Sequence, residues 1–235
     1  MKNQYVADIS DFRKYGALRH LQRVTGMNLG VWWLLAPDDS TTDGRKLAYL
    51  DKPKLRACDP ELFDAMKQLV ASGQRTVAAV ENAGVLPGAA FASEVVPDPK
   101  PARTTAFERA RASLSECDLI FVDPDNGLDV PSKPLGTKNS NKFVFRHELQ
   151  TFWSQGQSLV VYQHFVREKR APFMARLASD LRGRLPGARI VALRTSHAAF
   201  FVVMQPAHAD ALGQAVDGIE AFWKGQIAVH LIGTD

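Results

Sequence analysis

The chain has 235 residues, of which 46% are apolar and 23% charged, a balance that predicts one domain with a full hydrophobic core and excludes a disordered chain, a collagen and a coiled coil. Lysine and arginine outnumber aspartate and glutamate by 29 to 25, which fits either an ordinary solvated surface or a polyanionic partner. The longest apolar runs, 31–36 and 198–204, are much shorter than the roughly 18 to 20 residues that span a bilayer, so no membrane partner is expected.

A helix and a buried strand are predicted at the start of the chain. Asp8 or Ser10 can cap a helix whose apolar residues recur at helical spacing, and Gly26 follows its end. Residues 29–37 are an apolar run that stops at a proline, which is typical of a buried strand. Residues 38–44 have the composition of a loop.

The next segment is predicted to contain one helix and several short extended pieces. Residues 46–50 are expected to be extended. An aspartate followed by a proline opens a helix over residues 59–72. Residues 76–80 are predicted to be the second strand, ending at a glutamate and an asparagine, and residues 91–96 a weaker third one.

The second half of the chain alternates helix and strand patterns more clearly. The predicted helices are 104–115, 146–155, 172–185 and 208–223, and the predicted strands are 119–123, 158–162, 190–193, 199–204 and 227–232. Only RTSHA separates the strands 190–193 and 199–204, which predicts an antiparallel hairpin and an exposed His197 in its turn. Residues 128–144 are too rich in glycine, proline, asparagine and lysine for regular structure and are expected to be a long basic loop.

This order of elements predicts the fold class. Strands that alternate with helices form a mostly parallel sheet covered on both faces, so we expect a three-layer, Rossmann-like α/β fold with a C-terminal antiparallel hairpin. The whole chain, 1–235, is expected to be one domain that begins with a helical segment, 1–27. Ligands of such sheets bind outside the carboxyl ends of the strands.

Candidate functional residues follow two of these strands. DPDNG, residues 123–127, comes directly after the strand 119–123. Its carboxylates suit either of two jobs: accepting hydrogen bonds from an exocyclic amine, or holding a divalent cation. His164 follows the next strand and suits a general base. Alternatively, DPDNG has no functional role and forms only the turn that ends the strand, since aspartate, asparagine and glycine are common turn residues.

Three stretches of the sequence resemble a known family. YVADISDFRKYGALRHL (5–21), LIFVDPDNG (119–127) and AAFFVVMQPAHADALGQAVDGIEAFWKGQI (198–227) are similar, in this order, to segments of class I S-adenosylmethionine-dependent methyltransferases. The most similar family is that of the large-ribosomal-RNA adenine-N6 methyltransferases. These enzymes have an N-terminal segment of the form HAGNxADxxKHxxL and a DPPY motif after the fourth strand.

The resemblance implies a methyltransferase that acts on an amine of a nucleic-acid base, in RNA or DNA, with S-adenosylmethionine as cofactor. The catalytic candidates, all but Lys14 from the strand ends described above, are Asp123, Pro124, Asp125, Asn126, Lys14 and His164. The expected cofactor-binding residues are Tyr15, Pro37, Asp38, Asp39, Glu81 and Asn82, with Glu81 on the ribose hydroxyls.

Two features depart from the family pattern and leave other hypotheses open. The first strand runs into APDDSTTDG instead of a glycine-rich turn, and Asn126 replaces the motif aromatic that would stack on a flipped base. A second hypothesis is a metal-dependent phosphodiesterase or nuclease, with Asp123, Asp125, Glu81 and His164 around Mg or Mn. A third is a non-catalytic nucleic-acid-binding protein that keeps the fold.

Basic residues near the predicted site fit a nucleic-acid partner, although solvated surface charge is the common alternative. The candidates are Arg13, Lys138, Lys142, Arg167, Lys169 and Arg170. Cys58 and Cys117 are too few for a disulfide framework, and residues 1–10 lack the apolar core of a signal peptide, so we expect a cytoplasmic protein. The sequence does not indicate an oligomeric state.

Overall fold

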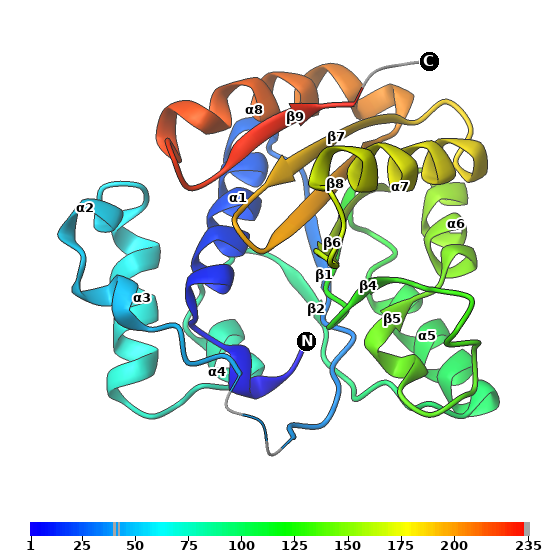
Figure 1. Cartoon of the computed structure of the whole chain (residues 1–235), viewed down its shortest axis with the longest axis horizontal. Coiled ribbons are helices and arrows are strands. Elements are labelled where there is room, and N and C mark those ends of the chain that lie inside the picture. Colours follow the sequence, from blue (N-terminus) through cyan, green and yellow to red (C-terminus); the bar gives the residue numbers. More distant parts are fainter. Residues whose placement is uncertain (40, 42, 233–235) are drawn as a thin grey trace.

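Alternating side chains of the central strands divide the interior between two hydrophobic cores. In the computed structural model, which describes residues 1–39, 41 and 43–232, Leu119 and Phe121 belong to one core and Ile120 and Val122 to the other. Because successive strand residues point to opposite faces, a strand that is apolar at every position must be covered on both sides. The sheet is therefore the middle of three layers (Figure 1).

The central sheet has seven strands in the order β2-β1-β3-β6-β8-β7-β9. Their bounds are β1 (Leu29–Trp32), β2 (Ala90–Ala92), β3 (Leu119–Val122), β6 (Ser158–His164), β7 (Arg189–Arg194), β8 (Ala198–Met204) and β9 (Ala228–Leu231). The first four of this order are parallel, whereas β8 is antiparallel to both β6 and β7, and β9 is antiparallel to β7. The predicted fold class and the C-terminal hairpin are confirmed.

Helices cover both faces of this sheet. Side chains of α1 (Ile9–Thr25), α3 (Pro60–Ala71), α4 (Val77–Asn82) and α8 (Ala209–Phe222) pack in one core, and those of α5 (Lys100–Ser113), α6 (Arg146–Ser154) and α7 (Arg170–Arg184) in the other. A short helix, α2 (Pro53–Arg56), precedes α3. None of the helices in the described part of the chain combines the length and apolarity needed to cross a bilayer.

Three local predictions were wrong. Residues 76–80 are not a strand: Thr76 caps α4 by accepting a hydrogen bond from Ala79 N–H, and the second strand of the sheet is β2. Residues 46–50 are not extended: Ala48–Asp51 form a 3-10 helix, in which Leu50 N–H donates to the Leu47 carbonyl and Tyr49 and Leu50 are buried. The expected loop 128–144 is not irregular throughout, because a short strand at each end takes part in a second sheet: β4 (Gly127–Leu128) pairs in parallel with β5 (Phe143–Val144).

The topology places several segments at one edge of the sheet. The order of strands reverses between β1 and β3, and ligands of open α/β sheets bind at such a switch point. The carboxyl ends of β3 and β6 meet there, together with the turn between β7 and β8. The helix α1 leads directly into β1, so its first turns also lie at this edge (Figure 1).

Candidate functional site

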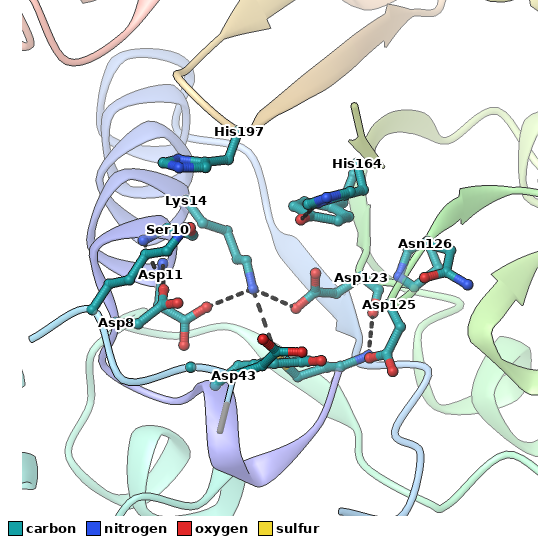
Figure 2. Close-up of a pocket in the computed structure, with 16 residues that line it drawn as sticks. Asp8, Ser10, Asp11, Lys14, Asp43, Asp123, Asp125, Asn126, His164 and His197 are labelled. Carbon is teal, nitrogen blue, oxygen red and sulfur yellow. Dashed lines mark hydrogen bonds and ion pairs between the residues drawn. The ribbon is translucent and has the colours of Figure 1, made fainter. Parts of the chain in front are cut away.

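A cavity of about 440 Å³ opens at this edge of the sheet. It is lined by Met1, Tyr5, Asp8, Ser10, Asp11, Lys14, Asp43, Gly44, Lys46, Asp123, Pro124, Asp125, Asn126, Tyr162, His164 and His197. All six residues predicted to be catalytic are among them. Figure 2 shows that their side chains come from α1, from the end of β3 and from the end of β6, which are far apart in the sequence.

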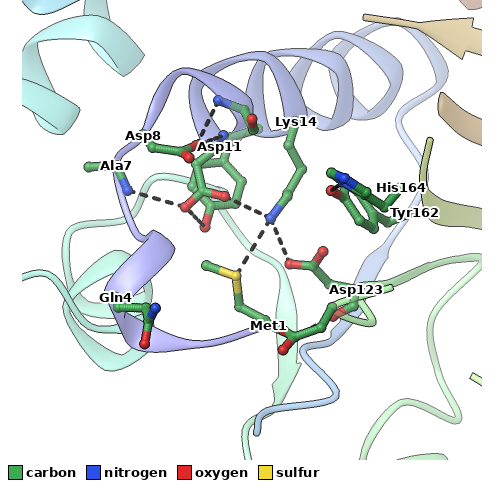
Figure 3. A network of polar contacts seen from close by, with 12 residues as sticks. Met1, Gln4, Ala7, Asp8, Asp11, Lys14, Asp123, Tyr162 and His164 are labelled. Atoms are coloured by element: carbon green, nitrogen blue, oxygen red, sulfur yellow. Dashed lines mark hydrogen bonds and ion pairs between the residues drawn. The ribbon is translucent and has the colours of Figure 1, made fainter. Parts of the chain in front are cut away.

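Lys14 joins two buried carboxylates at the bottom of the cavity (Figure 3). Its ammonium group donates to Asp11 Oδ1 and to Asp123 Oδ2, both at 2.7 Å, and lies 3.7 Å from Met1 Sδ. Asp11, Lys14 and Asp123 are only 1%, 3% and 2% exposed. The second oxygen of Asp123 accepts no hydrogen bond from the described residues, so it is free to accept one from a ligand.

The two carboxylates and the ammonium group shift one another's pKa values. Burial raises the pKa of Asp123 and of Asp11, and the positive charge of Lys14 opposes this in both cases. Burial would lower the pKa of Lys14, but the two carboxylates outweigh it and the pKa is raised. Lys14 is therefore protonated at neutral pH.

The segment after β3 is held in place by Gln163 on β6. Its side-chain oxygen accepts from Leu128 N–H at 2.9 Å, and its amide group donates to the carbonyl of Asn126 at 3.1 Å. Gly127 has a φ of 116°, and a Cβ there would lie 2.3 Å from the Gln163 side chain. This packing fixes Asn126 at the cavity wall.

Two histidines face the cavity from the opposite side (Figure 2). Burial lowers the pKa of His164, with a further contribution from Lys46. Burial also lowers the pKa of His197, and Lys46 and Arg13 add to this effect. Both rings are therefore neutral at pH 7 and able to accept a proton.

The predicted cofactor-binding residues do not line this cavity. Glu81 lies in α4, not at a strand end, and its carboxylate accepts hydrogen bonds from Trp33 Nε1 and Ser93 Oγ. The hydroxyl of Tyr15 donates to Asp11 below the cavity floor. Asn82 is the last residue of α4.

The region after β1, where the resemblance implies the methyl donor, is filled by the first residues of the described chain. The amino group of Met1 donates to the carbonyls of Leu34 and Asp123 at 3.2 and 2.7 Å. Asp38 accepts from Gln4 N–H, Asp39 pairs with Lys2, and Pro37 precedes them on the exposed loop. A Cβ on Gly44 would lie 2.3 Å from the Gln4 carbonyl oxygen, so this glycine accommodates the chain itself.

These residues therefore do not fit S-adenosylmethionine in the position that the resemblance implies. Gly44, the one glycine among residues 33–39, 41 and 43–50, packs against Gln4 and Tyr5, and the Glu81 carboxylate, expected on the ribose, accepts hydrogen bonds from a tryptophan and a serine.

The residues of the metal hypothesis do not converge either. Asp123 is paired with Lys14, and Asp125 lies 3.0 Å from the amino group of Met1 and 3.5 Å from Lys2 Nζ. Glu81 lies outside the cavity that Asp123, Asp125 and His164 share. In 1–39, 41 and 43–232, no three His, Cys, Asp or Glu residues are grouped so as to hold a metal ion.

The predicted nucleic-acid-binding residues lie on different sides of the cavity. Arg13 and Arg170 both donate to Ser196, in the turn beside His197. Lys142 lies beside the other wall, where its carbonyl accepts from Asn126 N–H. Arg167 and Lys169 are exposed just before α7, and Lys138 is exposed in the segment before β5.

Sequence reasoning missed several residues of the cavity. Asp8 was considered only as a helix cap, a role it has, since its Oδ1 accepts from Ser10 and Asp11 N–H. Asp11 could have been found, because it lies three residues before Lys14 on the same helix face. Nothing in the sequence indicated that Asp43 or Tyr162 would face the same space.

No protein-family model and no curated protein matches this chain.

Proposed function

We propose that the protein is a nucleic-acid enzyme that takes one base into this cavity and acts on the exocyclic amine of that base. The observation that carries the proposal is Asp123. This carboxylate is 2% exposed at the end of β3, with one oxygen held by Lys14 and the other available to the cavity. An amine N–H is a suitable donor for that second oxygen.

The surrounding residues suit this chemistry. A hydrogen bond from the amine to Asp123 Oδ1 would fix the nitrogen and direct its lone pair away from the carboxylate. The ion pair with Lys14 prevents Asp123 from rotating. When the amine nitrogen forms a bond to the transferred group it must lose a proton, and a neutral His164 or His197 at the opposite wall can accept that proton.

The depth of Asp123 sets a condition on the substrate. Because this side chain lies at the bottom of the cavity, a base inside a duplex could not reach it, and the substrate must be single-stranded or carry an extruded base. Adenine and cytosine carry a suitable amine, whereas thymine and uracil do not.

Methyl transfer is the reaction that the resemblance implies, and the mostly parallel sheet with its closing antiparallel hairpin supports it. The methyl donor would have to bind at a place other than the carboxyl end of β1, or residues 1–5 would first have to move away from that end. The proposal also locates the protein in the cytoplasm, where its free cysteines, Cys58 and Cys117, would remain reduced.

Oligonucleotide binding and methyl transfer test the proposal together. We would compare oligo(dA) and oligo(dT) of about 12 nucleotides, within the roughly 4 to 16 that a single-strand groove covers, and their RNA equivalents. Labelled S-adenosylmethionine would report transfer. The variant is Asp123→Asn, and the control is Asp210→Asn, an exposed aspartate on α8.

We expect the wild type to prefer oligo(dA), Asp123→Asn to lose this preference and about 100-fold or more of any transfer rate, and the control to match the wild type. Equal binding of oligo(dA) and oligo(dT) by the wild type would overturn base recognition. Binding of oligo(dA) without methyl transfer would support the non-catalytic alternative. Cleavage of the oligonucleotides that depends on Mg or Mn would support the nuclease alternative.

A further inference from the structure

A second cavity lies on the other side of the turn between β7 and β8, and the proposed function does not use it. Its volume is about 700 Å³. It is lined by Arg170, Arg194, Thr195, Ser196, Glu220, Ala221, Lys224, Gly225, Gln226, Ile227 and Ala228, and we call it the basic groove.

Positive charge dominates the basic groove. Among the described residues that line it, three are cationic, Arg170, Arg194 and Lys224, and one is acidic, Glu220. The carboxylate of Glu220 accepts a hydrogen bond from the backbone N–H of Val229. The side chains of Arg194 and Lys224 form no hydrogen bond with described residues, so their donors are available to an anion.

One turn separates the basic groove from the cavity that holds Asp123. Ser196 lines the groove and the next residue, His197, lines the cavity. Arg13 donates to Ser196 Oγ at 2.9 Å and Arg170 to the Ser196 carbonyl at 2.8 Å. Arg13 also donates to Gln226 Oε1 at 2.8 Å, on the groove wall. The turn that separates the groove from the cavity is therefore short, and Arg13 and Arg170 both hold it in place.

We propose that the basic groove binds backbone phosphates of the single strand whose base occupies the cavity. This inference rests on the proposed function. Among the described residues, five aspartates line the cavity, against two lysines and the amino group of Met1, so its net negative charge repels phosphate and the backbone on either side of a bound base must lie outside it. The basic groove begins one residue beyond the cavity, and arginine is well suited to binding phosphate oxygens.

The test separates the contacts to phosphate from the contacts to the base. We would measure the affinity of oligo(dA) and oligo(dT) at several salt concentrations for the double variant Arg194→Gln/Lys224→Gln. The matched control is Lys54→Gln/Lys67→Gln, which removes the same charge from exposed positions on α2 and α3. Thermal unfolding verifies that both proteins are folded.

For the groove variant we expect about tenfold weaker binding of both oligonucleotides at moderate salt, and a salt slope reduced by about 1 to 1.5, as two lost phosphate contacts predict. The preference for oligo(dA) should persist, because the cavity is unchanged. The control should bind like the wild type.

Unchanged affinity and salt slope in the groove variant would overturn this inference while leaving base recognition intact. The converse result, a weakened groove variant in a wild type that does not distinguish oligo(dA) from oligo(dT), would support the basic groove and contradict the proposed function. Competition by inorganic phosphate as strong as that by an oligonucleotide would show a site for a free anion and would overturn the role in strand binding.

Discussion

Lys14 lies between two buried carboxylates, and among the described residues no other cationic side chain forms an ion pair with either of them. Its stabilising contribution is complete below its ordinary pKa of 10.5 and is lost only as the pH rises through the higher value of the folded state. The charge balance of the cavity floor at neutral pH therefore depends on this one side chain.

We predict that Lys14→Met destabilises the protein by about 3 to 5 kcal/mol near pH 8, because it leaves two buried carboxylates without their cationic partner. Burial raises the pKa of Asp11 and Asp123, so the folded state of the variant binds protons more tightly than the unfolded state. Its stability should rise as the pH falls, and the deficit should shrink toward about pH 5.

Urea unfolding at both pH values measures this effect. The control is Lys46→Met, which removes an exposed lysine from the mouth of the same cavity and should change stability by less than about 0.5 kcal/mol. A loss below about 1 kcal/mol in Lys14→Met at both pH values would contradict the ion-pair interpretation.

The histidines of the cavity respond to charge at its mouth. Lys46 contributes to the lowered pKa of both His164 and His197, after burial itself. We predict that Lys46→Ala raises both pKa values toward the ordinary 6.5, as measured by NMR titration of the imidazole protons. His20, whose pKa is lowered by burial and by Arg23, is the internal control and should not move.

At the residue scale the sequence predicted Lys14, Asp123 and His164 as residues of the site, but it did not predict Asp11, Asp43 or Tyr162. Asp123 directly follows β3 and His164 is the last residue of β6, and both could be found because the carboxyl ends of neighbouring parallel strands share one edge of the sheet. Tyr162 lies within β6, two residues before its end, so a rule that selects strand ends does not include it, and Asp43 belongs to an irregular segment without a periodic pattern. The same rule also selected Pro37, Asp38 and Asp39 after the first predicted strand and Glu81 and Asn82 after the second, yet none of them lines the cavity, and the second of these strands is the helix α4.

Among the elements, α1 and α8 pack unusually closely. A Cβ on Gly16 of α1 would lie 1.9 Å from the ring of Trp223, which is 2% exposed directly after α8. The rings of Phe12 and Trp223 are 5.0 Å apart in the same contact. The contact therefore requires glycine at position 16 for space, not for backbone conformation.

We predict that Gly16→Ala destabilises the protein by about 2 to 3 kcal/mol or more, because the indole ring and the helix must move apart. Gly218→Ala is the matched control on α8, where the nearest atom to a new Cβ is 3.7 Å away. It should be neutral or stabilising by about 0.5 to 1 kcal/mol. Urea unfolding followed by tryptophan fluorescence distinguishes the two, and equal effects would contradict the packing argument.

The misassigned strand at 76–80 shows a limit of prediction at the element scale. Its β-branched residues favour an extended chain, but Val77 and Val80 are also three residues apart, the spacing of one helix face, and both are buried. With Thr76 as the cap and two alanines between the valines, the helix is favoured locally. Short apolar runs do not separate the two periodicities.

Across the whole molecule, the protection of backbone amides against hydrogen exchange should decrease from the middle of the sheet toward its edge strands. The strands β3, β6 and β8 have a partner on each side, whereas β2 and β9 have one. We predict that the amides of β3, β6 and β8 exchange only through global unfolding, whereas those of β2 and β9 exchange faster, through local opening. Native-state hydrogen exchange measures both rates. Equal protection of β9 and β6 would contradict this order.

The three-layer architecture could be predicted because it depends on alternation alone, whereas the order of strands could not. A hairpin of β7 and β8 fits either edge of a sheet by sequence pattern. It is the packing of both faces of β8, buried at all seven positions, that requires β8 to lie inside the sheet, between β6 and β7.

This placement of β8 has a consequence for the nascent chain on the ribosome. β6 is complete at residue 164, but its neighbour β8 is synthesised only after β7, from residue 198 onward. At about 5 to 20 residues per second, the open edge of β6 waits several seconds for its partner. During that interval the apolar run LVVY is exposed as an unpaired edge, where chaperones would bind and where premature association between chains would begin.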